Sequence, residues 1–370
     1  MYQNADDINP KEEIEGIEEG QDISLGEYPI DTVLIREDKK SVFELLRRIS
    51  NGDFILNPDF QRDFIWTEEK QSKFIESVLM RIPLPVLYFA ENNDGKMIVV
   101  DGVQRLTTFK RYLNNEFALK IKTKPGEKES ELNNKKFSDL TPKLKNRIED
   151  CGLIVYSIDS KVPEIARLDI FERVNSGVPL TRQQMRNCLY MGKATMFLKQ
   201  EASSDIFRQA TGQSLSSKSM RDREFVNRFC AFEIISLKEY KGDMDLFLAD
   251  CLKRMNIMDD EKLSGLSDRF RLSMRNNLII FGDYAFRKHT TDTKSRNVLN
   301  ASLWDVFSTK LSHYSEYQVQ EKKDLIHEKF YQLMEDQDFN DSISIGTNDQ
   351  KKVFRRFEKV DSMLKEVFHA

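Results

Sequence analysis

The sequence predicts an α+β protein in which a small mixed-sheet domain is followed by a mainly α-helical domain. Two short runs of β-favouring residues, 86–90 and 96–100, flank Asn92-Asn93-Asp94-Gly95, a turn sequence typical of a β-hairpin. From Pro163 onwards the apolar residues recur at helical spacing instead. The predicted parts are an acidic leader at 1–29, the α/β domain at 30–160 and the helical domain at 161–370.

The leader differs from the rest of the chain in charge. Residues 1–28 hold nine acidic residues and one lysine, a net charge of −8, so that the remainder carries +4 within the total of −4. Such an acidic segment with few apolar residues is expected to be disordered. It would act as a solubilising tail, or would shield a basic groove or dock a partner.

Composition indicates a soluble cytoplasmic protein without a membrane partner. The 370 residues are 39% hydrophobic and 32% charged, no window approaches 18 uninterrupted apolar residues, and the N-terminus is polar and acidic. Four widely spaced cysteines without a C-x-x-C pair predict free, mostly buried thiols in a reducing compartment and argue against a zinc site.

Two helices of the α/β domain have recognisable starts. Ser41 is a predicted N-cap for a helix at 42–49, with Glu44 at the capping-box position. Thr67 is a predicted N-cap for the next helix, whose apolar positions run to Ile82 on one face and which Pro83 ends. A further strand is expected at 153–158.

The helical domain is assigned from its 3.6-residue periodicity. The whole chain has 25 phenylalanines and 13 methionines. Most of them lie on the apolar faces of these helices, and they are interpreted as core residues. The first predicted helices are 165–175, 181–189, 193–200, 219–239, 244–255 and 261–281.

The most informative segment is Met97–Thr107, which is typical of a strand, a tight turn and a helix start. Asp101-Gly102 supply the turn, and the first helical turn offers unpaired N–H groups and the positive end of the helix dipole. Arg105 adds a planar fork suited to phosphate oxygens. The segment therefore indicates a phosphate-bearing ligand, although an ordinary turn with a surface arginine remains the alternative.

Asp101-Gly102-Val103-Gln104-Arg105 resembles the "DGQQR" signature of the N-terminal domain of GmrSD-type modification-dependent restriction enzymes, found also in SspE-like phage-defence proteins. That domain belongs to the ParB/sulfiredoxin superfamily, so the resemblance implies a ParB/sulfiredoxin-like fold here. Val103 stands where the family usually has glutamine, so the sequence departs from the signature at this one position. Further segments resemble the family in the same order: 57–66, 82–88, 171–181, 221–226 and 281–286.

The resemblance implies that the domain binds, and hydrolyses, a nucleoside triphosphate with Mg²⁺; which base it takes stays open. In the catalytic set, Arg105 would clamp phosphates, Gln104 would orient water or contact a phosphate, and Asp101 would hold Mg²⁺ through water or act as a base. Asp101 is equally suited to capping its own turn. The predicted nucleotide-binding residues are Gln61, Arg62, Gly102, Arg105, Thr107, Arg173 and Asn175.

No HNH nuclease constellation and no Walker A, G-x-S-x-G or H-E-x-x-H motif occurs. The resemblance therefore implies DNA and a separate nuclease or defence-system subunit as partners, and an oligomer is compatible with it. Basic runs such as Arg269–Arg275 and Arg287-Lys288 keep a DNA-binding or DNA-nicking ParB-like protein as the alternative. A non-catalytic, nucleotide-gated partner of a separate nuclease is a further alternative.

Overall fold

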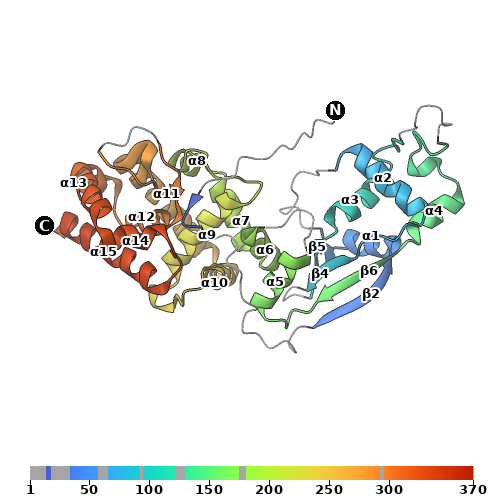
Figure 1. Ribbon diagram of the computed structural model, residues 1–370, viewed down its shortest axis with the longest axis horizontal. Helices are drawn as coiled ribbons and strands as arrows, with labels where there is room; N and C mark the ends of the chain where they lie inside the picture. Colours follow the sequence, from blue (N-terminus) through green and yellow to red (C-terminus); the bar gives the residue numbers. More distant parts are fainter. Residues whose placement is uncertain are drawn as a thin grey trace. The chain divides into compact units, whose positions relative to one another are not determined.

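A computed structural model of the chain describes residues 14–17, 34–56, 66–91, 95–121, 130–174, 181–291 and 296–369. It confirms the α+β class, because strands are concentrated in one part and helices dominate the rest (Figure 1). The chain divides into two compact units. The N-terminal unit comprises residues 25–180 and 184–189, and the C-terminal unit comprises 1–24, 181–183 and 190–370.

The N-terminal unit is built on a five-stranded mixed sheet with the strand order β2-β6-β4-β5-β3. The β2/β6 and β4/β5 pairs are antiparallel, whereas β4/β6 and β3/β5 are parallel. The predicted hairpin strands and the predicted strand at 153–158 are confirmed, and residues 92–94 between the hairpin strands lie outside the described residues. The strands are β2 (Ile35–Ser41), β3 (Phe54–Ile55), β4 (Leu87–Glu91), β5 (Met97–Asp101) and β6 (Gly152–Ile158).

Four helices gather along one face of this sheet (Figure 1). Because side chains alternate along a strand, Phe89, Val99 and Val155 share that face and are buried beneath the helices. Ile98, on the other face, packs against Cys188 instead. The four helices are α1 (Val42–Ser50), α2 (Glu68–Leu79), α3 (Val103–Leu113) and α4 (Pro142–Glu149), and α5 (Glu164–Val174) and α6 (Arg182–Leu189) complete the unit.

Both predicted N-caps are confirmed. The hydroxyl of Ser41 accepts a hydrogen bond from the N–H of Glu44 at 3.1 Å, and that of Thr67 accepts one from Lys70 at 3.3 Å. The expected capping-box role of Glu44 is corrected, because its carboxylate accepts hydrogen bonds from Lys40 and Arg48. Two neighbouring cations thus hold this side chain away from the N-cap.

The predicted end of α2 is also corrected. The helix ends at Leu79, so Ile82 is not on its apolar face and is 47% exposed. The N–H of Arg81 donates to the carbonyl of Val78, and the N–H of Ile82 donates to that of Ser77, the bond pattern of a Schellman motif. Arg81 occupies the left-handed position of this motif with φ 60°. The helix stops here because Pro83 disfavours helical geometry at the residue before it.

The C-terminal unit is a helical assembly around Trp304, which is fully buried. The rings of Phe207, Phe225 and Phe286 contact Trp304, and its indole N–H donates to the carbonyl of Phe225 at 2.8 Å. Its elements are β1 (Ile14–Glu15), α7 (Lys193–Ala202), α8 (Asp205–Thr211), α9 (Arg221–Ile234), α10 (Met244–Ile257), α11 (Asp260–Phe281), β7 (Leu299–Asn300), α12 (Ala301–Leu311), α13 (Glu316–Glu335), α14 (Gln337–Ser344) and α15 (Gln350–His369).

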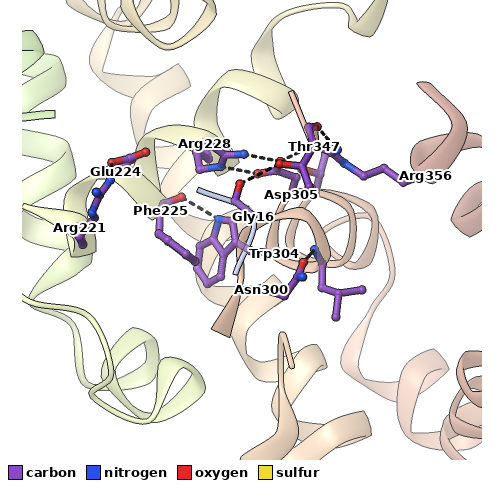
Figure 2. A network of polar contacts seen from close by, with 12 residues as sticks. Gly16, Arg221, Glu224, Phe225, Arg228, Asn300, Trp304, Asp305, Thr347 and Arg356 are labelled. Carbon is purple, nitrogen blue, oxygen red and sulfur yellow. Dashed lines mark hydrogen bonds and ion pairs between the residues drawn. The ribbon is translucent and has the colours of Figure 1, made fainter. Parts of the chain in front are cut away.

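A buried charge network lies beside this tryptophan (Figure 2). Asp305 accepts two hydrogen bonds of 2.7 Å from Arg228 and one of 2.8 Å from Arg356. Arg356 also donates to the carbonyl of Thr347 at 2.5 Å. All three charged side chains are at most 2% exposed, so their mutual pairing replaces the water that they have lost.

Part of the acidic leader is structured, which corrects the expectation of disorder for these residues. Ile14–Glu15 form β1 and pair in parallel with β7. The carboxylate of Glu15 pairs with Lys288 at 2.5 Å, and the carbonyl of Gly16 accepts a hydrogen bond from the hydroxyl of Thr347 (Figure 2). Residues 1–13 and 18–29 of the leader lie outside the described residues.

All four cysteines are free thiols, as predicted; three are buried and Cys151 is half-buried. Over the described part of the chain, we find no helix that combines the length and apolar content needed to cross a bilayer.

Candidate functional site

The turn between β5 and α3 requires a glycine. Gly102 has φ +108°, a left-handed conformation that side chains disfavour, and it immediately precedes α3. A Cβ atom at this position would lie 2.2 Å from Cδ2 of Leu87. Backbone conformation and available space therefore both exclude a side chain, and the motif glycine has a structural role.

Arg105 is buried and holds this turn together. Its guanidinium donates to the carbonyls of Pro85 and Val86, the latter at 3.0 Å, and to the carboxylate of Asp101 at 2.6 Å. The side chain is 10% exposed. Three of its five N–H donors are thus engaged within the unit, which leaves two for a ligand.

Burial shifts both members of this pair away from their charged forms. It raises the pKa of the Asp101 carboxyl above its usual value, although Arg105 and the N–H of Gly102 oppose the shift. Burial likewise lowers the pKa of Arg105, against the effect of Asp101. Because the two groups are in hydrogen-bond contact, we regard them as an ion pair whose carboxylate is more basic than a surface aspartate.

Two buried polar atoms on the first turns of α3 have no hydrogen-bond partner among the residues that the structure describes. These are Oε1 of Gln104 and Oγ1 of Thr107, which are one helical turn apart. The neighbouring Thr108 differs, because its hydroxyl donates to the carbonyl of Gln104 at 2.7 Å. A buried polar group without a hydrogen bond costs about 1–3 kcal/mol and calls for an explanation.

The other predicted site residues are placed as follows. Arg173, at the end of α5, has a side chain that is 59% exposed and pairs with Asp169 at 3.1 Å. Gln61, Arg62 and Asn175 lie outside the described residues. Of the predicted set, the structure brings together Asp101 and Arg105. The acceptors at Pro85 and Val86 were not predicted, since backbone carbonyls leave no signal in the side-chain pattern.

The donor set at the turn is suited to Mg²⁺ only as part of a larger coordination shell. Among the described residues there is no group of three or more histidine, cysteine, aspartate or glutamate side chains that could hold a metal. Mg²⁺ is commonly held by one or two carboxylates together with substrate phosphates and water. Asp101, with one oxygen already bonded to Arg105, fits such a shared site through a water molecule.

The basic run on α11 is engaged in ion pairs. Arg269 pairs with Glu233 at 2.7 Å, and Arg271 pairs with Glu201 at 2.9 Å. Arg275 pairs with a further glutamate at 2.5 Å. These cations are therefore partly neutralised on their own surface, which reduces the attraction that they would exert on a DNA backbone.

The N-terminal part of the chain is similar to a domain family of restriction endonucleases. Residues 42–191 match the family described as the N-terminal domain of the GmrSD restriction endonuclease. The resemblance based on the DGVQR turn is thereby confirmed. The similar segments at 221–226 and 281–286 lie outside the matched residues. The family description suggests a component of a restriction or phage-defence system.

A curated relative is an uncharacterized protein of Methanocaldococcus jannaschii, 26% identical over a match that covers 32% of this chain and 24% of that protein. The match thus spans about a quarter of the relative's length. No solved structure matches the chain.

Proposed function

We propose that the N-terminal unit binds a nucleoside triphosphate with Mg²⁺ at the Asp101–Arg105 turn, and hydrolyses it, as part of a DNA-restriction or phage-defence system. The observation that carries the proposal is the pair of buried atoms on Gln104 and Thr107 for which the described part of the chain supplies no hydrogen-bond partner. An unsatisfied buried polar group in a native structure calls for an explanation, and a catalytic role or a bound ion or ligand is one of those available. A ligand at this end of α3 would supply the missing partners.

The chemistry of the turn is compatible with phosphate binding. The first N–H groups of α3 and its dipole favour an anion, and Arg105 retains two donors. Thr107 would donate to a phosphate oxygen, while Oε1 of Gln104 would accept from a ligand hydroxyl or orient the attacking water. Asp101, with its raised pKa, is suited to act as a base or to accept from a Mg²⁺-bound water. Arg62, Gln61, Arg173 and Asn175 belong to the proposed site through the family resemblance.

The test should use variants that preserve the fold. Replacing Arg105 with alanine would leave Asp101 and two carbonyls without their partner, so loss of binding in that variant would be ambiguous. Thr107→Val is nearly isosteric and removes the unpartnered hydroxyl. Thr108→Val, one position along, is the matched control because its hydroxyl is already bonded within the helix.

We would titrate ATP, GTP, CTP and UTP with Mg²⁺ by calorimetry and measure phosphate release in parallel. Thr107→Val should weaken binding roughly tenfold, as expected for losing a hydrogen bond to a charged group. Thr108→Val should leave binding unchanged. Equal effects of the two substitutions would contradict the proposed site.

Two outcomes would favour the alternatives. Binding without phosphate release would indicate a nucleotide-gated partner of a separate nuclease. If no nucleotide binds, the family relationship extends only to the fold. DNA binding would then be tested through its dependence on salt, which is steep when phosphates are neutralised by lysine and arginine.

A further inference from the structure

The N-terminal unit contains a cleft that is lined by none of the residues of the Asp101–Arg105 turn. It has a volume of about 460 Å³ and opens between the end of α2 and helix α4. Val78, Pro83 and Leu84 form apolar parts of its lining. Its volume lies within the range of roughly 300–1,000 Å³ that is usual for small-molecule sites.

The charged residues that line this cleft are mostly cationic. Arg81, Lys143 and Arg147 face a single carboxylate, that of Asp150, which gives a net charge of +2. Within the described ranges, neither Arg81 nor Lys143 has a carboxylate within ion-pairing distance, whereas other cations of the unit do, such as Lys120 with Glu68 at 2.5 Å. The described residues therefore leave the cleft with a net positive charge.

Arg147 also lines the cleft and has a buried donor for which no described residue supplies an acceptor. Its Nη1 donates to the carbonyl of Leu79 at 2.8 Å, which fixes the guanidinium at the end of α2. Its Nε is buried, and none of the described residues accepts a hydrogen bond from it. Because Nε and a terminal nitrogen of a guanidinium can bind an oxyanion together, this N–H is suited to a phosphate or carboxylate oxygen.

Arg81 stands at a position where a glycine would be favoured. It follows the C-cap of α2 in a left-handed conformation, φ 60°, which costs free energy for any residue with a Cβ atom. The hydrogen bonds of the motif are made by the backbone and would form equally well with glycine. An arginine at this position is explained if its side chain binds a ligand in the cleft.

We propose that this cleft is a binding site for a phosphate-bearing small molecule, separate from the nucleotide site at the turn. Arg81, Lys143 and the Nε of Arg147 would hold the phosphate, and the apolar residues would contact the remainder of the ligand. A phosphate is favoured over a carboxylate because its charge of nearly −2 matches the net charge of the lining.

Cys151 makes this cleft directly observable. It lines the cleft and is half-buried, whereas the other three cysteines of the chain are buried. Burial raises the pKa of its thiol, so alkylation is slow enough to follow at alkaline pH. We would measure alkylation of Cys151 in the full chain by iodoacetamide, with inorganic phosphate, phenyl phosphate or AMP present, and would confirm affinities by calorimetry.

Phenyl phosphate and AMP should protect Cys151, and more strongly than inorganic phosphate. Arg81→Gly, which the backbone accommodates, and Lys143→Ala, at an exposed position, should each weaken protection at least roughly fivefold. Lys110→Ala, an exposed lysine of α3 outside the cleft, and Thr107→Val should leave it unchanged. Thr107→Val also separates this site from the proposed nucleotide site, since it should affect the latter alone.

A 5′-phosphorylated oligonucleotide distinguishes the source of the phosphate. If the oligonucleotide protects Cys151 at a lower concentration than AMP does, the ligand is the end of a nucleic acid. If AMP protects Cys151 and the oligonucleotide does not, the ligand is a free small molecule. Absence of protection by every phosphate compound, or equal protection in wild type and Arg81→Gly, would overturn the proposal.

Discussion

Replacing Asp305 with alanine should destabilise the C-terminal unit severely. Asp305 is shared by two buried arginines, and Arg228 makes both of its side-chain hydrogen bonds to this carboxylate (Figure 2). Arg356 keeps bonds to the carbonyls of Thr347 and Ser342. The substitution thus leaves one buried guanidinium without an acceptor and a second only partly satisfied.

The expected loss follows from these contacts. Removing one partner of a buried ion pair costs about 3–5 kcal/mol, because a charge remains buried without compensation. We expect a value near the upper end, about 5 kcal/mol, since two arginines are affected. A typical domain has a total stability of about 5–15 kcal/mol, so the variant should lose a large part of it.

Each unit carries one of the two tryptophans, which permits a clean assay. In a Trp66→Phe background, the fluorescence of Trp304 reports urea unfolding of the C-terminal unit alone. Asp305→Asn keeps the shape and an acceptor and should cost less. Asp361→Ala removes an exposed partner of Lys310 and should cost less than about 1 kcal/mol. A loss below about 1 kcal/mol for Asp305→Ala would refute the reasoning.

Three further predictions concern other residues. Gly102→Ala should destabilise the N-terminal unit by about 2–4 kcal/mol in a urea titration, because it combines a left-handed backbone with a clash against Leu87. Arg81→Gly should raise the stability of the same unit by about 1 kcal/mol, measured in the same way, since it relieves a left-handed arginine. The Nε2 atoms of His289 and His327 lie 3.3 Å apart, and burial lowers the pKa of each below the usual 6.5. The unfolded state then binds protons more readily, so the stability of the C-terminal unit should fall as the pH drops below about 6.5, and His327→Gln should flatten this dependence in melts from pH 5 to 8.

The sequence predicted elements whose signals are local. Ser41 and Thr67 cap helices because a hydroxyl three residues before a backbone N–H is a short-range arrangement. The hairpin of β4 and β5 was found from its apolar strands and turn residues. By contrast, β2 was missed: its sequence, Ile35-Arg-Glu-Asp-Lys-Lys-Ser41, has five charged residues and little apolar alternation. It is an edge strand, where exposed charges discourage pairing with other chains.

The candidate site was predictable in its backbone but not in its side-chain contacts. The strand, glycine turn and helix at 97–113 follow from the sequence. The burial of Arg105 does not, because it depends on the carbonyls of Pro85 and Val86, about 20 residues earlier in the chain. The unpartnered atoms of Gln104 and Thr107 are likewise a product of packing, which no residue pattern reveals.

The pairing of β1 has a consequence for the order in which the protein is made. Gly16 is bonded to Thr347 across 331 positions of the sequence, whereas the core of the N-terminal unit lies within residues 42–155. A chain emerging from the ribosome can complete that core first, as domains generally fold in order of synthesis. The segment around Ile14 must wait until β7 and the helices after it have been translated. This segment precedes the N-terminal unit in the sequence and is therefore made before it, yet it reaches its final place later, and during that interval the residues of β1 are unpaired and open to other strands.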